Sequence, residues 1–435
     1  MGEKAGFLPF PKSFETICMH HGQDPTQWKS KAVIPHIVPS TIFEIDDPTG
    51  PKEYIYSRVG NPTRSILESV LAAINKGRFG LCFSSGMSAL TAILGLLKKD
   101  EHLICCEEIS GDSHEVFKNI ATNYGICTTF VDVTDINIVC KAIQPNTKLI
   151  WVENPSNATL KITDICSISK LAKENEILVG VDNTFLTPYL QRPLELGADI
   201  VMHSLTKYMN GHSDIIMGSL CVERQDLHKQ LSLIQVVMGL VPSPIDCYQV
   251  IRGLKTLGLR MDQHHINSII IAKFLDRNSV VEKVVHPGLR THANYNVFKQ
   301  QASGHSGILS FYIKGGLHES VEFIKCLPLR KLPEGSKAQC KYRKDMLFNY
   351  IKHHSSVILF AVPTLNKKLN ELQNELREKD NYILIKKLDE KISNDLGAEA
   401  EQFIDNPNGH TEKNLNNMAE RNNQILEEIP QGRIR

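Results

Sequence analysis

Residues 177–208 read ILVGVDNTFLTPYLQRPLELGADIVMHSLTKY, and two short apolar runs in this stretch decide the fold. The runs Ile177–Val181 and Ile200–Met202 are rich in valine and isoleucine and too short for helices, so we expect two buried strands. Another such run is Leu149–Val152. Along the chain these runs alternate with segments of helical period, which are Ser65–Ile74 and Ile165–Lys173. The alternation predicts an α/β fold, with a mostly parallel sheet and helices on both faces.

Polar residues directly follow the two runs of the opening stretch. Asp182 comes after the first run, and Lys207 follows the second together with Ser204 and Thr206. Ligand sites in parallel sheets lie beyond the carboxyl ends of the strands, so these residues are candidates for chemistry. Taken alone, such an aspartate is usually a helix cap and such a lysine a solvated charge. Two hydroxyls beside the lysine suit a phosphate held next to an amine that forms a Schiff base.

A candidate anion site precedes the uncharged apolar stretch Gly86–Leu97. This stretch is too short to span a bilayer, so it predicts a buried helix. At its start, Gly86 and Met87 would present backbone N–H groups to a phosphate. Serine and glycine also begin many helices for structural reasons alone. Together with Asp182 as partner of a pyridinium nitrogen and Lys207 as the amine, the turn predicts a pyridoxal phosphate site.

Composition limits the classes of partner. The 435 residues suffice for two or three domains, and 42% are hydrophobic, which excludes overall disorder. A net charge of +1 gives no general attraction to nucleic acid or to an anionic membrane. The eleven cysteines are scattered without metal-ligand spacing, and no apolar leader is seen, so we expect a cytoplasmic protein without a metal site. A small molecule or another protein chain is the expected partner.

The composition changes near residue 330. Of the 106 residues from Arg330 to Arg435, 34 are charged, against 63 of the 329 before them. Leucines and isoleucines spaced like the a and d positions of a heptad follow within this tail: Leu365, Leu369, Leu372, Leu376 and Ile383, then more loosely Leu388, Ile392 and Leu396. This spacing fits a coiled coil or an amphipathic helix that lies on the body.

Six motifs stand in the order and spacing of one enzyme family. They are YSRVGNPTR (56–64), SSGM (84–87), ENPSN (153–157), DNTF (182–185), SLTKYMNGHSD (204–214) and PSPID (242–246). In these motifs, over residues 6–329, the chain resembles the transsulfuration, or Cys/Met-metabolism, enzymes of the type I pyridoxal phosphate fold. The openings GFLP (6–9) and HGQDPTQW (21–28) are most similar to the animal γ-lyases of that family.

The resemblance implies a role for each matching residue. Lys207 would carry the Schiff base and move protons, Asp182 would pair with the pyridinium nitrogen, and Asn157 would lie near the ring hydroxyl. Around the phosphate it places Gly86, Met87, Ser204 and Thr206. Tyr56 and Arg58 would reach the phosphate of a neighbouring subunit, so a homotetramer is expected. The implied domains are an N-terminal arm (1–60), a large cofactor-binding domain (61–255), the start of a small domain (256–329) and a divergent tail (330–435).

The implied activity is a carbon–sulfur lyase that cleaves cystathionine to cysteine, 2-oxobutyrate and ammonia. Alternatives are a sibling γ-synthase or methionine γ-lyase, or a catalytically impaired relative that binds cofactor and acts in oligomerisation or interaction. Two departures from the family motivate the last. Ser110 replaces a tyrosine that stacks on the cofactor ring, and the family's motif for the arginine that binds the substrate carboxylate is not found beyond Leu329. Three tail arginines are weak candidates for that role: Arg330, Arg343 and Arg377.

Overall fold

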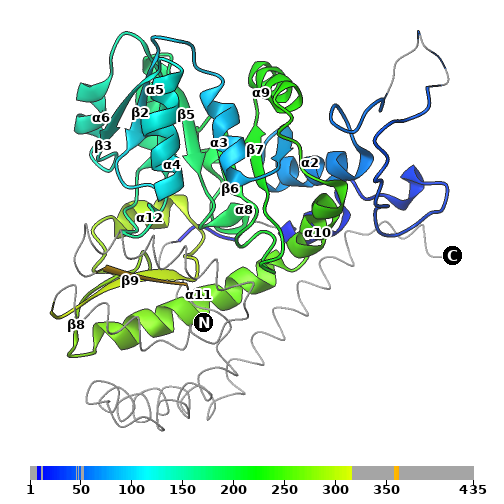
Figure 1. The fold of residues 1–435 in the computed structure, drawn as a ribbon. Coiled ribbons are helices and arrows are strands. Elements are labelled where there is room, and N and C mark those ends of the chain that lie inside the picture. Colours follow the sequence, from blue (N-terminus) through cyan, green and yellow to red (C-terminus); the bar gives the residue numbers. More distant parts are fainter. Residues whose placement is uncertain are drawn as a thin grey trace, which may run out of the picture. The chain divides into compact units, whose positions relative to one another are not determined.

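A seven-stranded sheet organises the chain (Figure 1). The computed structural model describes residues 7–10, 13–45, 47, 49, 53–315 and 357–361. The order in the sheet is β1-β7-β6-β5-β4-β2-β3, with β7 antiparallel to its neighbours and the other pairs parallel. The strands are β1 (Phe79–Phe83), β2 (His102–Cys106), β3 (Cys127–Val131), β4 (Thr147–Glu153), β5 (Leu178–Asp182), β6 (Ile200–Ser204) and β7 (Gly218–Val222).

The helices of the described chain alternate with these strands. They are α1 (Phe14–His20), α2 (Pro62–Ile74), α3 (Gly86–Leu94), α4 (Gly111–Glu115), α5 (Ala121–Asn123), α6 (Ile136–Ala142), α7 (Ile165–Glu174), α8 (Thr187–Leu190), α9 (Gln225–Val237), α10 (Pro244–Leu254), α11 (Leu257–Asp276) and α12 (Tyr295–Gln301). Short turns η1 (Pro25–Gln27), η2 (Val116–Ile120) and η3 (Pro193–Leu196) complete the set. The mostly parallel α/β sheet is therefore confirmed.

The three apolar runs predicted as strands lie in β4, β5 and β6, and the two helical segments lie in α2 and α7. Helix α2 begins at Pro62, three residues before the predicted start. Asn61 causes the earlier start, because its side chain accepts hydrogen bonds from the N–H groups of Thr63 and Arg64. The apolar stretch Gly86–Leu97 forms the buried helix α3, which ends at Leu94.

Helices cover both faces of the large sheet. In β1, Leu81 and Phe83 belong to a buried cluster with α3 and α7, whereas Cys82 between them packs with α2 and α10. Successive side chains of a strand point to opposite faces, so at β1 buried side chains pack on both faces of the sheet. None of the helices in the described chain is long and apolar enough to cross a membrane.

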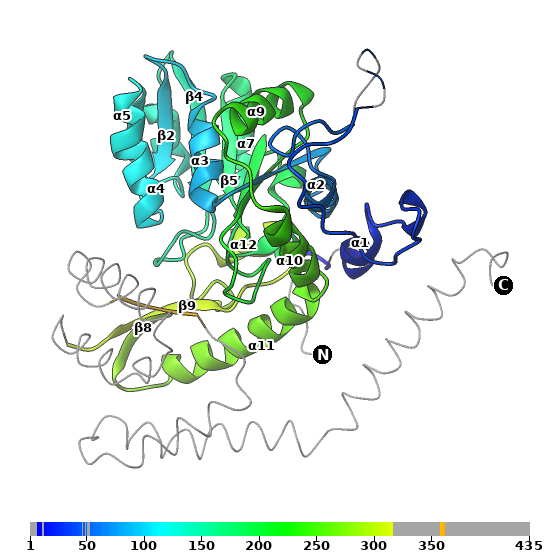
Figure 2. The ribbon, with the colours of Figure 1, turned by 45° about the vertical axis from the view of Figure 1, so that its right-hand side comes forward.

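A second sheet packs on α11 (Figures 1 and 2). It contains β8 (Val281–Val285), β9 (Ile308–Ile313) and β10 (Val357–Ala361) in the order β10-β9-β8, with antiparallel pairs. The sequence analysis did not predict β10, which lies in the charged tail. The heptad-like seam 365–396 and the three tail arginines lie outside the described residues.

Buried histidines lie near the junction of α11 and this second sheet. The rings of His265 and His305 stack with 3.8 Å between centroids. The Ser268 hydroxyl lies 3.1 Å from both His286 Nε2 and His305 Nδ1. Burial, and then the neighbouring imidazoles, lower the pKa of His286 to about 3 and that of His305 well below its usual value. Both rings are therefore neutral at physiological pH.

Candidate active site

The carboxyl ends of three neighbouring parallel strands meet at one edge of the large sheet. Glu153, Asp182 and Ser204 are the last residues of β4, β5 and β6. Glu153 pairs in register with Asp182, and Asp182 pairs with Met202, two residues before Ser204. The sheet thus brings together residues that are far apart in sequence, as the order of apolar runs predicts.

Asp182 is tied to the end of β6 through Thr184. The Thr184 N–H donates to Asp182 Oδ1 at 2.9 Å, and the Thr184 hydroxyl accepts the Ser204 N–H at 2.8 Å. Burial raises the pKa of Asp182, while hydrogen bonds from Thr184 and the positive charge of Lys207 act in the opposite direction. Asp182 and Lys207 are therefore close enough for their charges to interact.

Lys207 lies in the turn after β6 and is exposed. Its backbone N–H donates to Ser204 O at 3.2 Å. Beside it, the Thr206 hydroxyl accepts the Met217 N–H at 3.0 Å, so this side chain also fastens the turn to the residue before β7. The lysine amine thus projects from a turn held by its neighbours. We call Asp182, Ser204, Thr206, Lys207, Gly86 and Met87 the strand-end group.

Two glycines let the turn before α3 approach the strand-end residues. A Cβ on Gly86 would lie 3.2 Å from Ser204 Cβ, and a Cβ on Gly218 would lie 2.3 Å from Ser85 O, closer than atoms can approach. Ser85 caps α3 by accepting the Ser88 N–H at 3.0 Å. The amides of Gly86 and Met87 belong to the first helical turn, which has no intrahelical acceptors for its N–H groups.

The donor set of this group fits pyridoxal phosphate. A helix N-terminus next to a serine hydroxyl suits the phosphate, because amide dipoles and O–H groups both favour an anion. Asp182, with the lysine charge nearby, suits a protonated ring nitrogen, and the exposed Lys207 amine suits the aldehyde. All these features come from one chain and one edge of the sheet.

Glu153 is a buried acid in this region that the sequence analysis did not single out. Its Oε2 accepts the Ser110 N–H at 3.0 Å, and it also accepts the backbone N–H of Asn157. Burial and the neighbouring Asp182 raise the pKa of Glu153 well above its usual value. Glu153 thus connects the loop after β2 to the loop that carries Asn157. An acid at the end of an otherwise apolar run was the available signal.

Ser110 stands at the start of α4, and its hydroxyl lies 2.8 Å from that of Ser113. A serine presents no ring surface to a cofactor, so this position offers one small hydroxyl where the resemblance implies an aromatic side chain. The difference from the family noted in the sequence therefore lies in the loop fastened by Glu153, at the candidate site.

Tyr56 and Arg58 have a different environment. The Arg58 guanidinium carbon lies 5.4 Å from the centre of the Tyr56 ring, and Arg58 Nη1 donates to Val236 O at 2.8 Å, near the end of α9. Both side chains are exposed. The described contacts of these two side chains are with each other and with α9, and do not include the strand-end group. We call residues 53–60 the arm segment.

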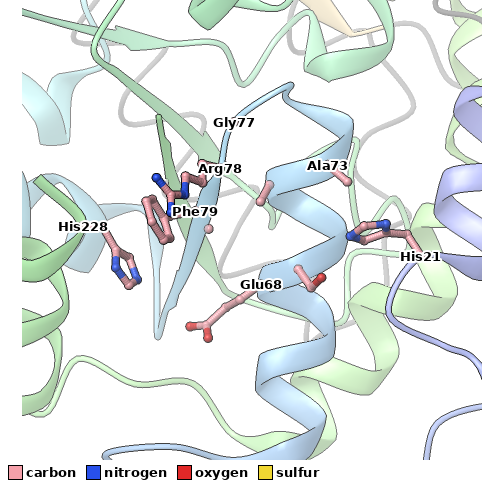
Figure 3. Close-up of a pocket in the computed structure, with 10 residues that line it drawn as sticks. His21, Glu68, Ala73, Gly77, Arg78, Phe79 and His228 are labelled. Carbon is pink, nitrogen blue, oxygen red and sulfur yellow. The ribbon is translucent and has the colours of Figure 1, made fainter. Parts of the chain in front are cut away.

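Within the described ranges, no group of three or more histidine, cysteine, aspartate or glutamate residues could hold a metal ion. A cavity of about 380 Å³ lies beside α2 and β1 and is lined by Glu68, Arg78, Phe79 and His228, among others (Figure 3). None of its lining residues belongs to the strand-end group.

Comparison with known proteins agrees with this geometry. Residues 15–335 match the family model described as Cys/Met metabolism PLP-dependent enzyme. The chain is 46% identical to human cystathionine gamma-lyase over 330 residues, which cover 76% of this chain and 82% of the relative. Among solved structures, cystathionine gamma-lyase from Lactobacillus plantarum, complexed with L-serine, has a TM-score of 0.69 and 34% identity, and covers 71% of this chain and 81% of that one.

A synthase is similar to the same extent. Cystathionine gamma synthase from Xanthomonas oryzae pv. oryzae, in complex with aminoacrylate and cysteine, has a TM-score of 0.71 and 36% identity, and covers 74% of this chain and 84% of that one. The family match spans most of the chain and includes every residue of the strand-end group. The chain therefore belongs to the Cys/Met-metabolism family of pyridoxal phosphate-dependent enzymes, and pyridoxal phosphate is its cofactor.

Proposed function

We propose that the protein is a carbon–sulfur lyase of transsulfuration that cleaves cystathionine to cysteine, 2-oxobutyrate and ammonia. The observation that carries the proposal is the strand-end group, in which an exposed lysine amine and a half-buried aspartate interact beside a helix N-terminus. The identity of 46% to a named cystathionine gamma-lyase supports this choice of substrate.

Each residue of the group has a task in such a reaction. Bound pyridoxal phosphate supplies an electron sink for the substrate carbon that loses its proton. The Lys207 amine would hold the cofactor aldehyde in the resting enzyme. It would then take the proton from the substrate Cα and assist the removal of a second proton, from Cβ. Asp182 keeps a proton on the ring nitrogen. Gly86, Met87 and Ser204 fix the phosphate, so that the reacting bonds keep one orientation to the lysine.

The arm segment completes a second site in this proposal. Arg58 carries a planar fork suited to phosphate, and its exposed position allows it to bind the cofactor of a neighbouring subunit. Large apolar side chains between residues 33 and 59 are unusually exposed: Val59 by 58%, Ile42 by 70% and Val33 by 76%. An apolar surface of this kind is typical of a subunit interface, so we propose a homotetramer with shared sites.

A second candidate is a cofactor-binding relative with reduced turnover. Ser110 favours it, because the residue offers neither a ring to cover the cofactor nor a phenol to move a proton. The loss of a positioned acid or base typically lowers a rate by about 10² to 10⁴. This candidate would still bind the cofactor through the strand-end group.

One assay separates these activities. The purified chain, loaded with pyridoxal phosphate, is incubated with cystathionine, with an activated homoserine ester plus cysteine, and with methionine. The proposal expects release of 2-oxobutyrate and cysteine from cystathionine as the fastest reaction. Faster formation of cystathionine from the ester would identify a synthase instead, and bound cofactor without any product would identify the non-catalytic relative.

A further inference from the structure

A buried arginine on α2 holds the backbone of the arm segment. Arg64 is 3% exposed, and its guanidinium donates from Nη1 to Ser57 O at 2.9 Å and from Nη2 to Arg58 O at 3.3 Å. One planar side chain thus grips two consecutive carbonyls in an otherwise exposed segment. Such a fork fixes the direction of the backbone, because both bonds must lie in the plane of the guanidinium.

Glu68 provides the countercharge one helical turn later. Its Oε1 lies 3.5 Å from Arg64 Nε and accepts the Cys82 N–H at 2.9 Å. Figure 3 shows its side chain leaving α2 on the same side as Phe79 of β1. Burial raises the pKa of Glu68, and the positive charge of Arg64 opposes that rise. The pair therefore links the helix that grips the arm to strand β1.

Gln235 of α9 extends this link. Its Nε2 donates to Glu68 Oε1 at 3.3 Å and to Cys82 O at 2.6 Å. The next residue, Val236, offers the carbonyl that binds the Arg58 guanidinium. Arg58 is thus fixed twice, through its backbone by Arg64 and through its side chain by α9. Cys82 lies two residues before Ser84, where the phosphate turn begins.

We infer that Arg64 is a positioning residue that aims Arg58 at the cofactor phosphate of a neighbouring subunit. The inference rests on the proposed role of Arg58. A buried ion pair is seldom the most stable way to fill such a space, so stability alone does not explain it. Fixing the backbone of an exposed binding residue before association removes part of the ordering entropy that binding would otherwise require.

A double-mutant cycle on cofactor affinity tests this inference. Arg64→Lys keeps a positive charge beside Glu68, but an ammonium cannot reproduce the planar fork. The dissociation constant of pyridoxal phosphate is measured on the full chain by equilibrium dialysis for wild type, Arg64→Lys, Arg58→Ala and the double variant. Subunit assembly is followed by sedimentation and stability by urea unfolding. Arg192→Lys is the matched control, because Arg192 also binds a carboxylate, that of Glu195, and a carbonyl, that of Pro188.

We expect Arg64→Lys to weaken cofactor binding about tenfold when Arg58 is present and less than twofold when Arg58 is already alanine, because Arg64 acts through Arg58. An equal loss in both backgrounds, or no loss in either, would overturn the inference. If Arg58→Ala itself leaves the affinity unchanged, the phosphate role of Arg58 is wrong and the inference falls with it.

Glu68→Gln repeats the cycle from the other end of the link and decides the matter if Arg64→Lys does not fold. It keeps an acceptor for the Cys82 N–H but removes the charge that faces Arg64. Its effect on affinity should likewise vanish in the Arg58→Ala background. A loss that persists there would show that the pair serves only the fold.

Discussion

The strand-end group and the arm segment differ in how we propose that they bind the cofactor: the first acts within one chain and the second across a subunit boundary. Asp182, Ser204 and Lys207 are brought together by adjacent parallel strands, so one chain builds their geometry without help. Tyr56 and Arg58 instead lie exposed against α9. The first region depends on the sheet, whereas in our proposal the second gains its function only when another subunit is present. Changes in the two regions should therefore have effects of different size and kind.

The largest effect is expected in the strand-end group. Lys207→Ala removes the amine that we propose holds the cofactor and moves the substrate protons, so turnover of cystathionine should fall by more than about 10³-fold. The yellow absorption of lysine-bound cofactor should vanish as well. Turnover is measured as 2-oxobutyrate release. A variant that retains a tenth of the activity would mean that another lysine serves.

Ser110→Tyr tests whether the loop after β2 limits turnover at the strand-end group. The added phenol restores a ring surface and a proton donor, so turnover should rise. The upper limit of the gain is the usual contribution of a positioned acid or base, about 10²- to 10⁴-fold. Cofactor affinity should change much less than the rate. Ser113→Ala is the control, because it removes the hydroxyl that contacts Ser110 without adding a ring. A rate unchanged by the tyrosine would show that this position is not limiting.

A smaller effect is expected in the arm segment. Arg58→Ala should weaken cofactor binding by about 1.5 to 3 kcal/mol, the usual contribution of a hydrogen bond to a charged group. The loss should appear only in the oligomer, since we propose that Arg58 binds the phosphate held by another subunit. Affinity measured across a dilution series by sedimentation and dialysis checks this. A monomer with full cofactor affinity would remove the distinction between the two regions.

The last effect lies outside both regions and concerns the stability of the fold in acid. His286 is neutral in the folded chain, with a pKa of about 3, and it has an ordinary pKa near 6.5 when unfolded. Unfolding therefore takes up a proton between these values, and the free energy of unfolding should fall by about 1.4 kcal/mol per pH unit as pH decreases from about 6 to 4.

Urea unfolding of His286→Gln measures that contribution. The dependence of unfolding on pH should be weaker than in wild type by about one proton over the same interval, because glutamine does not titrate. Titrating groups that do not contact His286, including the buried acids, affect both proteins and cancel in the difference. Parallel pH curves for the two would show that His286 is already charged in the folded chain.

The sequence allowed prediction of the strand-end group because Asp182 and the segment from Ser204 to Lys207 follow short apolar runs, whereas Gly86 and Met87 begin an apolar stretch. Glu153 escaped notice since it ends such a run and looks like part of the strand. The Arg64–Glu68–Gln235 link joins α2 to α9 and involves Cys82 of β1, a contact that no local pattern encodes. The ring contact of His265 with His305 likewise joins residues that are distant in sequence. The residues of local motifs could thus be predicted from the sequence, whereas polar contacts between residues distant in sequence could not.

The most direct test of the account is to find where the cofactor attaches. The full chain is incubated with pyridoxal phosphate, reduced with borohydride, digested and analysed by mass spectrometry. The strand-end group predicts one modified peptide, with the added mass on Lys207. Modification of a different lysine, or of none in a protein that binds the cofactor, would contradict the assignment of this site.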